Sequence, residues 1–189
     1  MRDRHRLILI ASTLLGSWLG MQAAHELGHV LGALVTGGAI ARVVLYPLAL
    51  SRTDLASNPW PLVVVCTGPL GGVLLPLGLW GLAAAGRVSW AFVPRFYAGF
   101  CLVANGAYIG CGTFAPVGDA QELLHHGAPT WLLGAFGAVA VPAGLWLWNG
   151  QGGHFGLGPA RTEVRPGIAY ACAGVCVALL VLGFAVDGT

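Results

Sequence analysis

Long apolar runs separated by short polar segments make up most of the chain, and a run of about 20 apolar residues suffices to cross a bilayer. We expect five membrane-spanning helices, at residues 7–36, 60–85, 94–113, 130–148 and 166–186. Residues 39–59 differ, because the β-branched IARVVLYPLAL is followed by SRTDLASNP, which is typical of a polar turn. There we expect a short strand or β-hairpin at the membrane face, or a re-entrant segment.

This pattern predicts an all-α polytopic membrane protein in which residues 1–189 form a single domain. Gly68-Pro69 and Pro76 are expected to break the second span, since proline interrupts helical hydrogen bonding. Between the spans, the strongly polar stretch is APVGDAQELLHHGAP, at residues 115–129.

The composition supports a membrane location. The chain is 57% hydrophobic and 8% charged, whereas soluble domains are about a quarter charged. Its basic residues are all arginine and the net charge is only +2, which argues against nucleic acid as a partner. The five cysteines lack metal-binding spacing and are interpreted as small buried hydrophobes. We expect a multi-pass protein of a bacterial plasma membrane.

The arginines predict an orientation, because cytoplasmic loops are enriched in basic residues. With the N-terminus inside, two arginines fall outside, Arg42 and Arg52. Seven fall on the cytoplasmic side: Arg2, Arg4, Arg6, Arg87, Arg95, Arg161 and Arg165. The start of the chain also fits a secretory signal, but cleavage would leave the following HELGH motif without a helix, so we interpret it as the first span.

The HELGH motif, at residues 25–29, places three ionisable groups in one turn of the first span. In a helix His25 and His29 share a face and can bind one Zn²⁺. Glu26 lies beside them and can take a proton from an attacking water, as in other H-E-x-x-H hydrolases. Such groups are costly inside a membrane and are usually functional.

Two histidines leave a catalytic zinc one protein ligand short. The extended motif would need histidine at position 35, which is Val35. Asp119 is our choice, because it follows the third span between apolar flanks, and Glu122 is the runner-up. Asp54 is interpreted as a solvated turn residue. Glu122 with His125 could instead form a second metal-binding pair or the polar face of a surface helix.

Two motifs resemble those of the site-2 protease class of intramembrane zinc metalloproteases. They are HELGHVLGALVTGG, at the end of the first span, and GPLGG, in the second. The resemblance covers residues 7–124 and implies a three-span catalytic core, with accessory spans at residues 130–186. It also implies that Asp119 is the third zinc ligand, and that a transmembrane protein is hydrolysed by metal-activated water with Glu26 as general base.

The sequence departs from the N-x-x-P…D-G motif of that class. Cys111 or Gly112 stands where asparagine is usual, and Ala120 follows the aspartate where glycine is usual. Asn105, on the third span, could position a substrate or form an ordinary helix–helix hydrogen bond. In the better-known members zinc lies near the cytosolic face, whereas the arginines place HELGH toward the outer face, and the sequence leaves this conflict open.

A second interpretation is a non-catalytic zinc-binding membrane protein, such as a metal sensor or carrier. Four further histidines, His5, His125, His126 and His154, could supply additional ligands. A third is a scaffold that keeps the fold without cutting. The presence of Glu26 favours hydrolysis, since a structural metal needs no general base. The substrate and the oligomeric state stay open.

Overall fold

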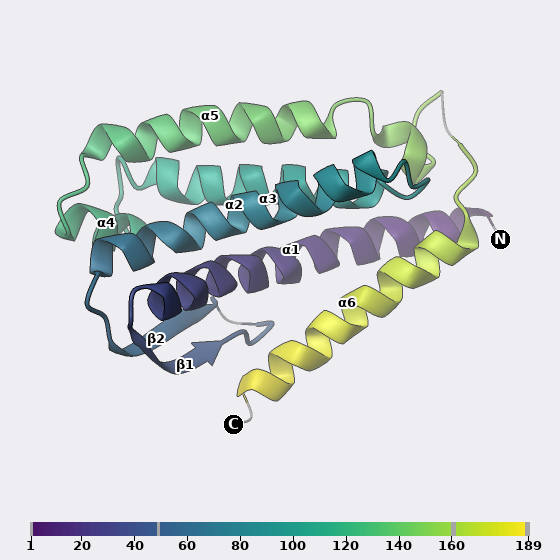
Figure 1. Cartoon of the computed structure of the whole chain (residues 1–189). Helices are drawn as coiled ribbons and strands as arrows, with labels where there is room; N and C mark the ends of the chain where they lie inside the picture. Colours follow the sequence, from purple (N-terminus) through teal and green to yellow (C-terminus); the bar gives the residue numbers. More distant parts are fainter. Residues whose placement is uncertain (1, 49, 160–161, 188–189) are drawn as a thin grey trace.

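The computed structural model describes residues 2–48, 50–159 and 162–187. Its elements are α1 (Arg2–Val35), β1 (Ala39–Val44), β2 (Arg52–Ser57), α2 (Pro61–Ala85), α3 (Phe92–Cys111), α4 (Asp119–His125), α5 (Thr130–Trp148), η1 (Gly152–Phe155) and α6 (Pro166–Asp187). The helices α1, α2, α3 and α5 run side by side, and α6 lies against α1 (Figure 1). This confirms the predominantly helical fold.

Among the described residues, four helices are long and apolar enough to cross a membrane: α1 from Asp3, α2, α5 and α6 up to Val186. The predicted third span is the helix α3, but its composition does not place it in this group. It packs against α2 and α5, and Asn105 and Cys101 are among its buried residues. Neighbouring helices therefore cover its polar groups, so α3 has less need of an apolar surface.

Helix α2 differs from the prediction in being continuous. Both Pro69 and Pro76 lie inside it, and both are buried. Proline removes one backbone N–H, but apolar helices tolerate this where neighbouring groups satisfy the freed carbonyl. The second span is therefore not broken.

Helices α1 and α2 touch backbone to backbone where GPLGG meets HELGH. A Cβ built on Gly71 would lie 2.7 Å from the Cα of Gly28, closer than real Cβ atoms approach. A Cβ on Gly28 would collide with the Thr67 carbonyl, and one on Gly68 would collide with the His29 ring. The three glycines therefore bring α2 directly against the face of α1 that carries His29.

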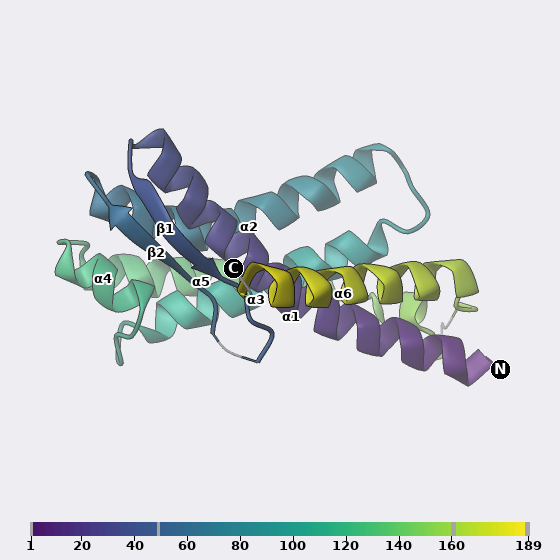
Figure 2. The same cartoon turned by 90° about the horizontal axis from the view of Figure 1, so that it is seen from below.

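The predicted hairpin is confirmed, with one correction. Strands β1 and β2 pair antiparallel, with Ile40 opposite Leu55 and Val44 opposite Arg52. The second strand, however, lies within SRTDLASNP, which we predicted as a turn, and the turn comes earlier, after Val44. Pairing with β1 outweighs the low β-propensity of this polar segment. The hairpin lies beside the C-terminal half of α1 (Figure 2).

The cysteines follow the prediction only in part. Cys101 and Cys176 are buried, and Cys66 and Cys172 are partly buried. Cys111 is exposed, because it is the last residue of α3. The interpretation as a buried hydrophobe is therefore wrong for Cys111.

Candidate metal centre

Three side chains that the sequence selected lie together in the structure. His25 and His29 come from one face of α1, and Asp119 is the first residue of α4. The Nε2 atom of His25 lies 2.7 Å from Oδ2 of Asp119 and 3.2 Å from Nε2 of His29. The Nε2 atom of His29 lies 3.3 Å from the same carboxylate oxygen. This group could hold a metal ion.

The spacing of the three atoms fits a tetrahedral ion. Ligand atoms bound to zinc at its usual distances are about 3.3 Å apart. Two edges of the triangle, at 3.2 and 3.3 Å, already have this length. The third edge, from His25 to Asp119, is 2.7 Å and would have to open by about 0.6 Å.

The outer ring nitrogens orient both histidines. Nδ1–H of His25 donates to Oδ1 of Asn105 at 2.7 Å, and Nδ1–H of His29 donates to the Val64 carbonyl at 2.9 Å. With the protons assigned to Nδ1, each Nε2 directs a lone pair at the Asp119 carboxylate. Three acceptor atoms so close together need a cation between them, either protons or a metal ion.

Asp119 is held in place by its own backbone. The preceding Gly118 has φ +53°, a conformation that favours glycine, and a Cβ there would collide with the Tyr108 hydroxyl. The N–H of Asp119 donates to that hydroxyl at 2.8 Å. Burial alone would raise the pKa of Asp119. When protons take the place of a metal ion between the three atoms, however, hydrogen bonds from His25 and His29 and the positive charge of the protonated rings hold this pKa below its ordinary value. Asp119 thus supplies the negative charge of this group.

Glu26 lines a cavity beside His25, His29 and Asp119, which we call the metal group. Its side chain is buried, and its Oε2 accepts a hydrogen bond of 2.7 Å from the Thr53 hydroxyl on β2. The cavity has a volume of about 730 Å³ and lies between α1, α2, α3, α4 and the hairpin. Its apolar lining includes Trp18, Met21, Leu55, Pro61 and Val64. A buried carboxylate thus faces a cleft large enough for several side chains.

The other candidate carboxylates lie outside the metal group. Glu122 lines the cavity, but it is half exposed and its Oε2 lies 3.5 Å from Nε2 of His126. Its ring partner is therefore His126, four residues on, in place of the predicted His125. Asp54 lies on β2, where it accepts a hydrogen bond from the guanidinium of Arg52. The geometry favours Asp119 over Glu122 as third ligand.

The additional histidines do not join this group in the described part of the chain. His5 packs edge-on against Tyr170, and His154 stacks on Phe92, both at the far end of the bundle. His125 contacts the ring of His126. None of these contacts brings a second set of metal ligands to the centre.

Sequence reasoning missed part of the surroundings of the site. Asn105 does form a helix–helix hydrogen bond, but its partner is the metal-group residue His25. Thr53 and Tyr108 were not singled out, because each acts through a contact with a residue distant in sequence or on another element. Their residue types carry no signal for such contacts, so only the fold could show them.

Replacing Asn105 by alanine is expected to lower zinc affinity about 10- to 100-fold, because it removes the acceptor that orients His25. Asn105→Asp keeps an acceptor at that position and should restore most of the affinity. Competition with a chromophoric chelator measures both variants against wild type. Wild-type affinity in Asn105→Ala would show that the hydrogen bond does not orient the ligand.

No family model matches the chain, and none of the curated proteins or solved structures compared with it matches. The likeness to site-2 proteases therefore remains one of motifs. What the structure adds is a mostly helical chain, four of whose described helices are long and apolar enough to cross a membrane, and a buried His-His-Asp group that could bind a metal ion.

Proposed function

We propose that this protein is an intramembrane zinc metalloendopeptidase of the site-2 protease class. The observation that carries the proposal is the meeting of His25, His29 and Asp119 in a cavity that also contains Glu26. Two imidazoles and one carboxylate are three protein ligands, the number that catalytic zinc sites have when they keep an open position. Four long apolar helices support a location in the membrane.

The ligand set favours one zinc ion per chain, held by His25, His29 and Asp119. When bound, zinc supplies Lewis-acid chemistry that makes water a nucleophile near neutral pH. Asn105 and Val64 keep the two imidazoles in the required tautomer and orientation. Asp119 would supply the one anionic ligand of the set.

Glu26 would act as general base and then as general acid. Its carboxylate accepts one proton from the attacking water as the carbon–oxygen bond forms, and gives that proton to the amine nitrogen as the peptide bond breaks. The second proton of that water leaves the new carboxyl group and also ends on the amine, so the products are a carboxylate and a protonated amine, and Glu26 returns to its ionised form. The Thr53 hydroxyl holds one carboxylate oxygen, which leaves the other for the proton.

The substrate would be a transmembrane protein segment in extended form, because the amides of a helix are shielded and internally bonded. Leu50, Ser51, Thr53 and Leu55, in and just before β2, line the cavity, whereas no residue of β1 does. We therefore assign substrate pairing to β2. Main-chain hydrogen bonds would hold the segment, as in other strand additions.

Metal removal tests the proposal. The purified protein, incubated with a single-span membrane substrate in detergent, should cleave it, lose this activity after chelation, and regain it with about one zinc per chain. A protein that binds zinc stoichiometrically but never cleaves any of a panel of membrane substrates would instead be the non-catalytic metal-binding protein.

A further inference from the structure

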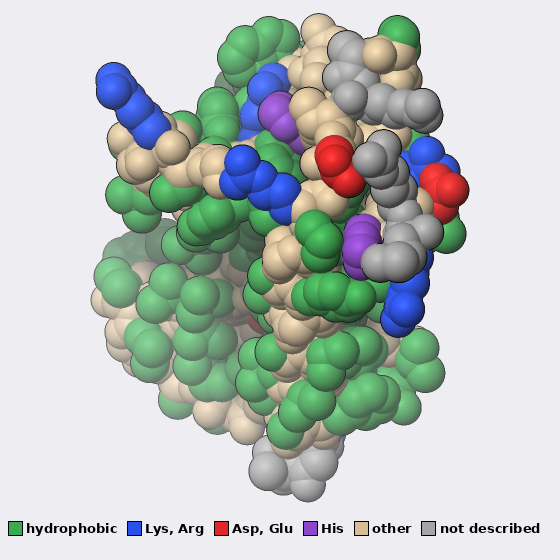
Figure 3. All heavy atoms as spheres, turned by 90° about the vertical axis from the view of Figure 1, so that its right-hand side faces the viewer, with side chains coloured by type: hydrophobic (Ala, Val, Ile, Leu, Met, Phe, Trp, Pro, Cys, Tyr) green, Lys and Arg blue, Asp and Glu red, His purple; other side chains and the backbone are tan. Residues whose placement is uncertain are grey.

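The two ends of the helical bundle carry opposite charge. Five arginines with described side chains gather at the end where the chain starts: Arg4, Arg6, Arg87, Arg95 and Arg165. We call this the arginine end, and Figure 3 shows basic side chains there beside acidic ones. The acidic residues are Asp3, in the first turn of α1, and Glu163, so basic charge still exceeds acidic charge at this end. The opposite end, which we call the metal end, holds Glu26, Asp54, Asp119 and Glu122 and two arginines, Arg42 and Arg52.

The two ends lie about one membrane thickness apart. Arg6 and His25 both lie on α1, and 19 residues of helix span about 28 Å. The hydrocarbon core of a bilayer is about 30 Å thick. With the arginine end at one surface, the metal group therefore lies close to the other, where water can reach it.

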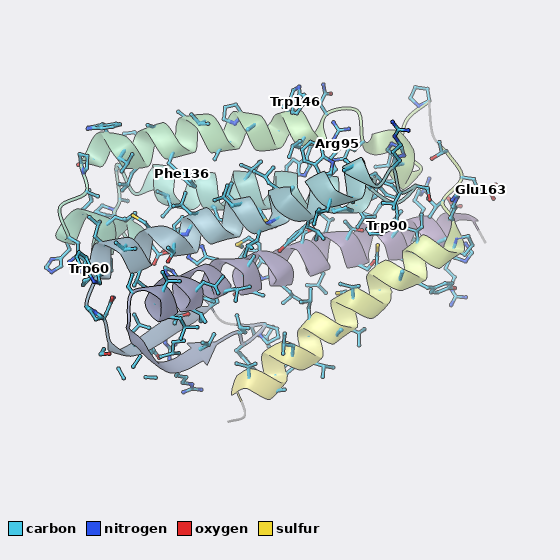
Figure 4. The ribbon with its side chains drawn as sticks, in the orientation of Figure 1. Trp60, Trp90, Arg95, Phe136, Trp146 and Glu163 are labelled. Atoms are coloured by element: carbon cyan, nitrogen blue, oxygen red, sulfur yellow. The ribbon has the colours of Figure 1, made fainter. Side chains whose placement is uncertain are left out.

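Exposed tryptophans mark both ends, as they do at the two interfaces of membrane proteins. Trp60 and Trp131 are exposed at the starts of α2 and α5, at the metal end. Trp90 and Trp146 are exposed toward the arginine end, and Figure 4 shows Trp90 and Arg95 at the end opposite Trp60. Exposed tryptophans therefore lie at both ends of the bundle, as expected if the two ends are at the two membrane interfaces.

We propose that the arginine end binds the anionic phospholipid headgroups of the cytoplasmic leaflet, so that the metal-site cleft opens at the extracytoplasmic face. Guanidinium groups pair well with phosphate, and the cytoplasmic leaflet is the anionic one. Internal contacts use only part of their donors. Arg6 pairs with Asp3 at 2.9 Å, Arg95 donates to the Asn149 carbonyl and Arg165 donates to the Ser89 hydroxyl. Each guanidinium has five N–H groups, so these contacts leave donors over.

This orientation defines the class of substrate, a step that rests on the proposed function. The substrate would be a membrane helix that unwinds at its extracytoplasmic end, where the cleft opens. Cleavage there would release the outer portion of the substrate outward and leave the rest in the membrane. A substrate whose only unwound segment lies at the cytoplasmic surface would not be cut.

Labelling of cysteines with a membrane-impermeant maleimide in intact bacterial cells tests the orientation. Cys111 is exposed at the metal end, so wild type should be labelled and Cys111→Ser should not. The double variant Cys111→Ser/Ser89→Cys places the thiol at the arginine end. It should be labelled about tenfold less than wild type until the cells are permeabilised. The reverse result, or equal labelling of both in intact cells, overturns the proposal.

Moving charge tests whether the arginines set the orientation. Replacing Arg4, Arg6 and Arg87 by glutamine and exposed Phe114 by arginine should reduce Cys111 labelling about twofold or more, because both orientations then form. The matched control, Arg42→Gln with Arg52→Gln, removes charge from the metal end and should leave labelling unchanged. Unchanged labelling in the first variant would overturn the role of the arginines. Neither readout requires cleavage, so a protein that is correctly oriented but inactive would refute only the proposed function.

Discussion

Replacement of Glu26 by glutamine is expected to abolish cleavage of a membrane substrate and to leave the zinc content of the protein near that of wild type. Glutamine keeps the size of the side chain and can still accept the hydrogen bond from Thr53, but it cannot take a proton from water. Proton transfer by a positioned side chain contributes about 10²- to 10⁴-fold, so a loss of about 10³-fold is expected. Initial cleavage rates and metal analysis of the same preparations measure the two effects.

The matched control for this variant is Glu122→Gln. Glu122 lines the same cavity, but it is half exposed and lies outside the metal group. Its replacement should leave cleavage within about threefold of wild type, as for other exposed positions. Wild-type activity in Glu26→Gln would show that another group moves the proton. A large loss in Glu122→Gln would transfer that role to Glu122.

Purified wild-type protein is expected to contain close to one zinc per chain, and His25→Ala is expected to contain almost none. His25 contributes both a ligand atom and the link to Asn105. In Asp119→Ala the two histidines remain, so zinc should still bind but much more weakly, because the site has lost its anionic ligand. Metal analysis after dialysis against a weak chelator distinguishes the three proteins.

His126→Ala is the control for metal binding, because this histidine lines the same cavity without belonging to the metal group. It should keep the zinc content of wild type. The runner-up assignment makes the opposite prediction for the carboxylates. If Glu122→Ala lost zinc while Asp119→Ala retained it, Glu122 would be the third ligand.

The metal group was predictable because two kinds of local signal coincide in it. The i, i+4 spacing of His25 and His29 is a property of any helix, and the apolar run around them predicts the helix. Asp119 was selected as a carboxylate between apolar flanks at the end of a span. Its contact with α1, 94 positions away in the chain, depends on the packing of α3 and α4, which no local pattern specifies.

The differences between the predicted and the observed fold also come from contacts between elements distant in sequence. Polarity predicted a turn at SRTDLASNP, but its pairing with β1 makes it a strand. Proline predicted breaks in α2, but buried packing keeps the helix continuous. Hydropathy alone gives four spans in the described chain, whereas the predicted third span is the helix α3, whose polar Asn105 is covered by neighbours. In each case a contact with another element overrides the local preference.

The backbone contact between Gly28 and Gly71 has a consequence for which walls of the cavity can vary. Not even a methyl group fits between Gly28 and Gly71. Helices α1 and α2 therefore cannot slide along one another without displacing His29. New specificities would have to arise in the remaining walls of the cleft, the hairpin strand β2 and the short helix α4, whose side chains are partly exposed. Under the proposed function, we therefore expect changes in substrate preference to come from substitutions at Leu50–Leu55 and around Glu122, and not from Gly28 or Gly71.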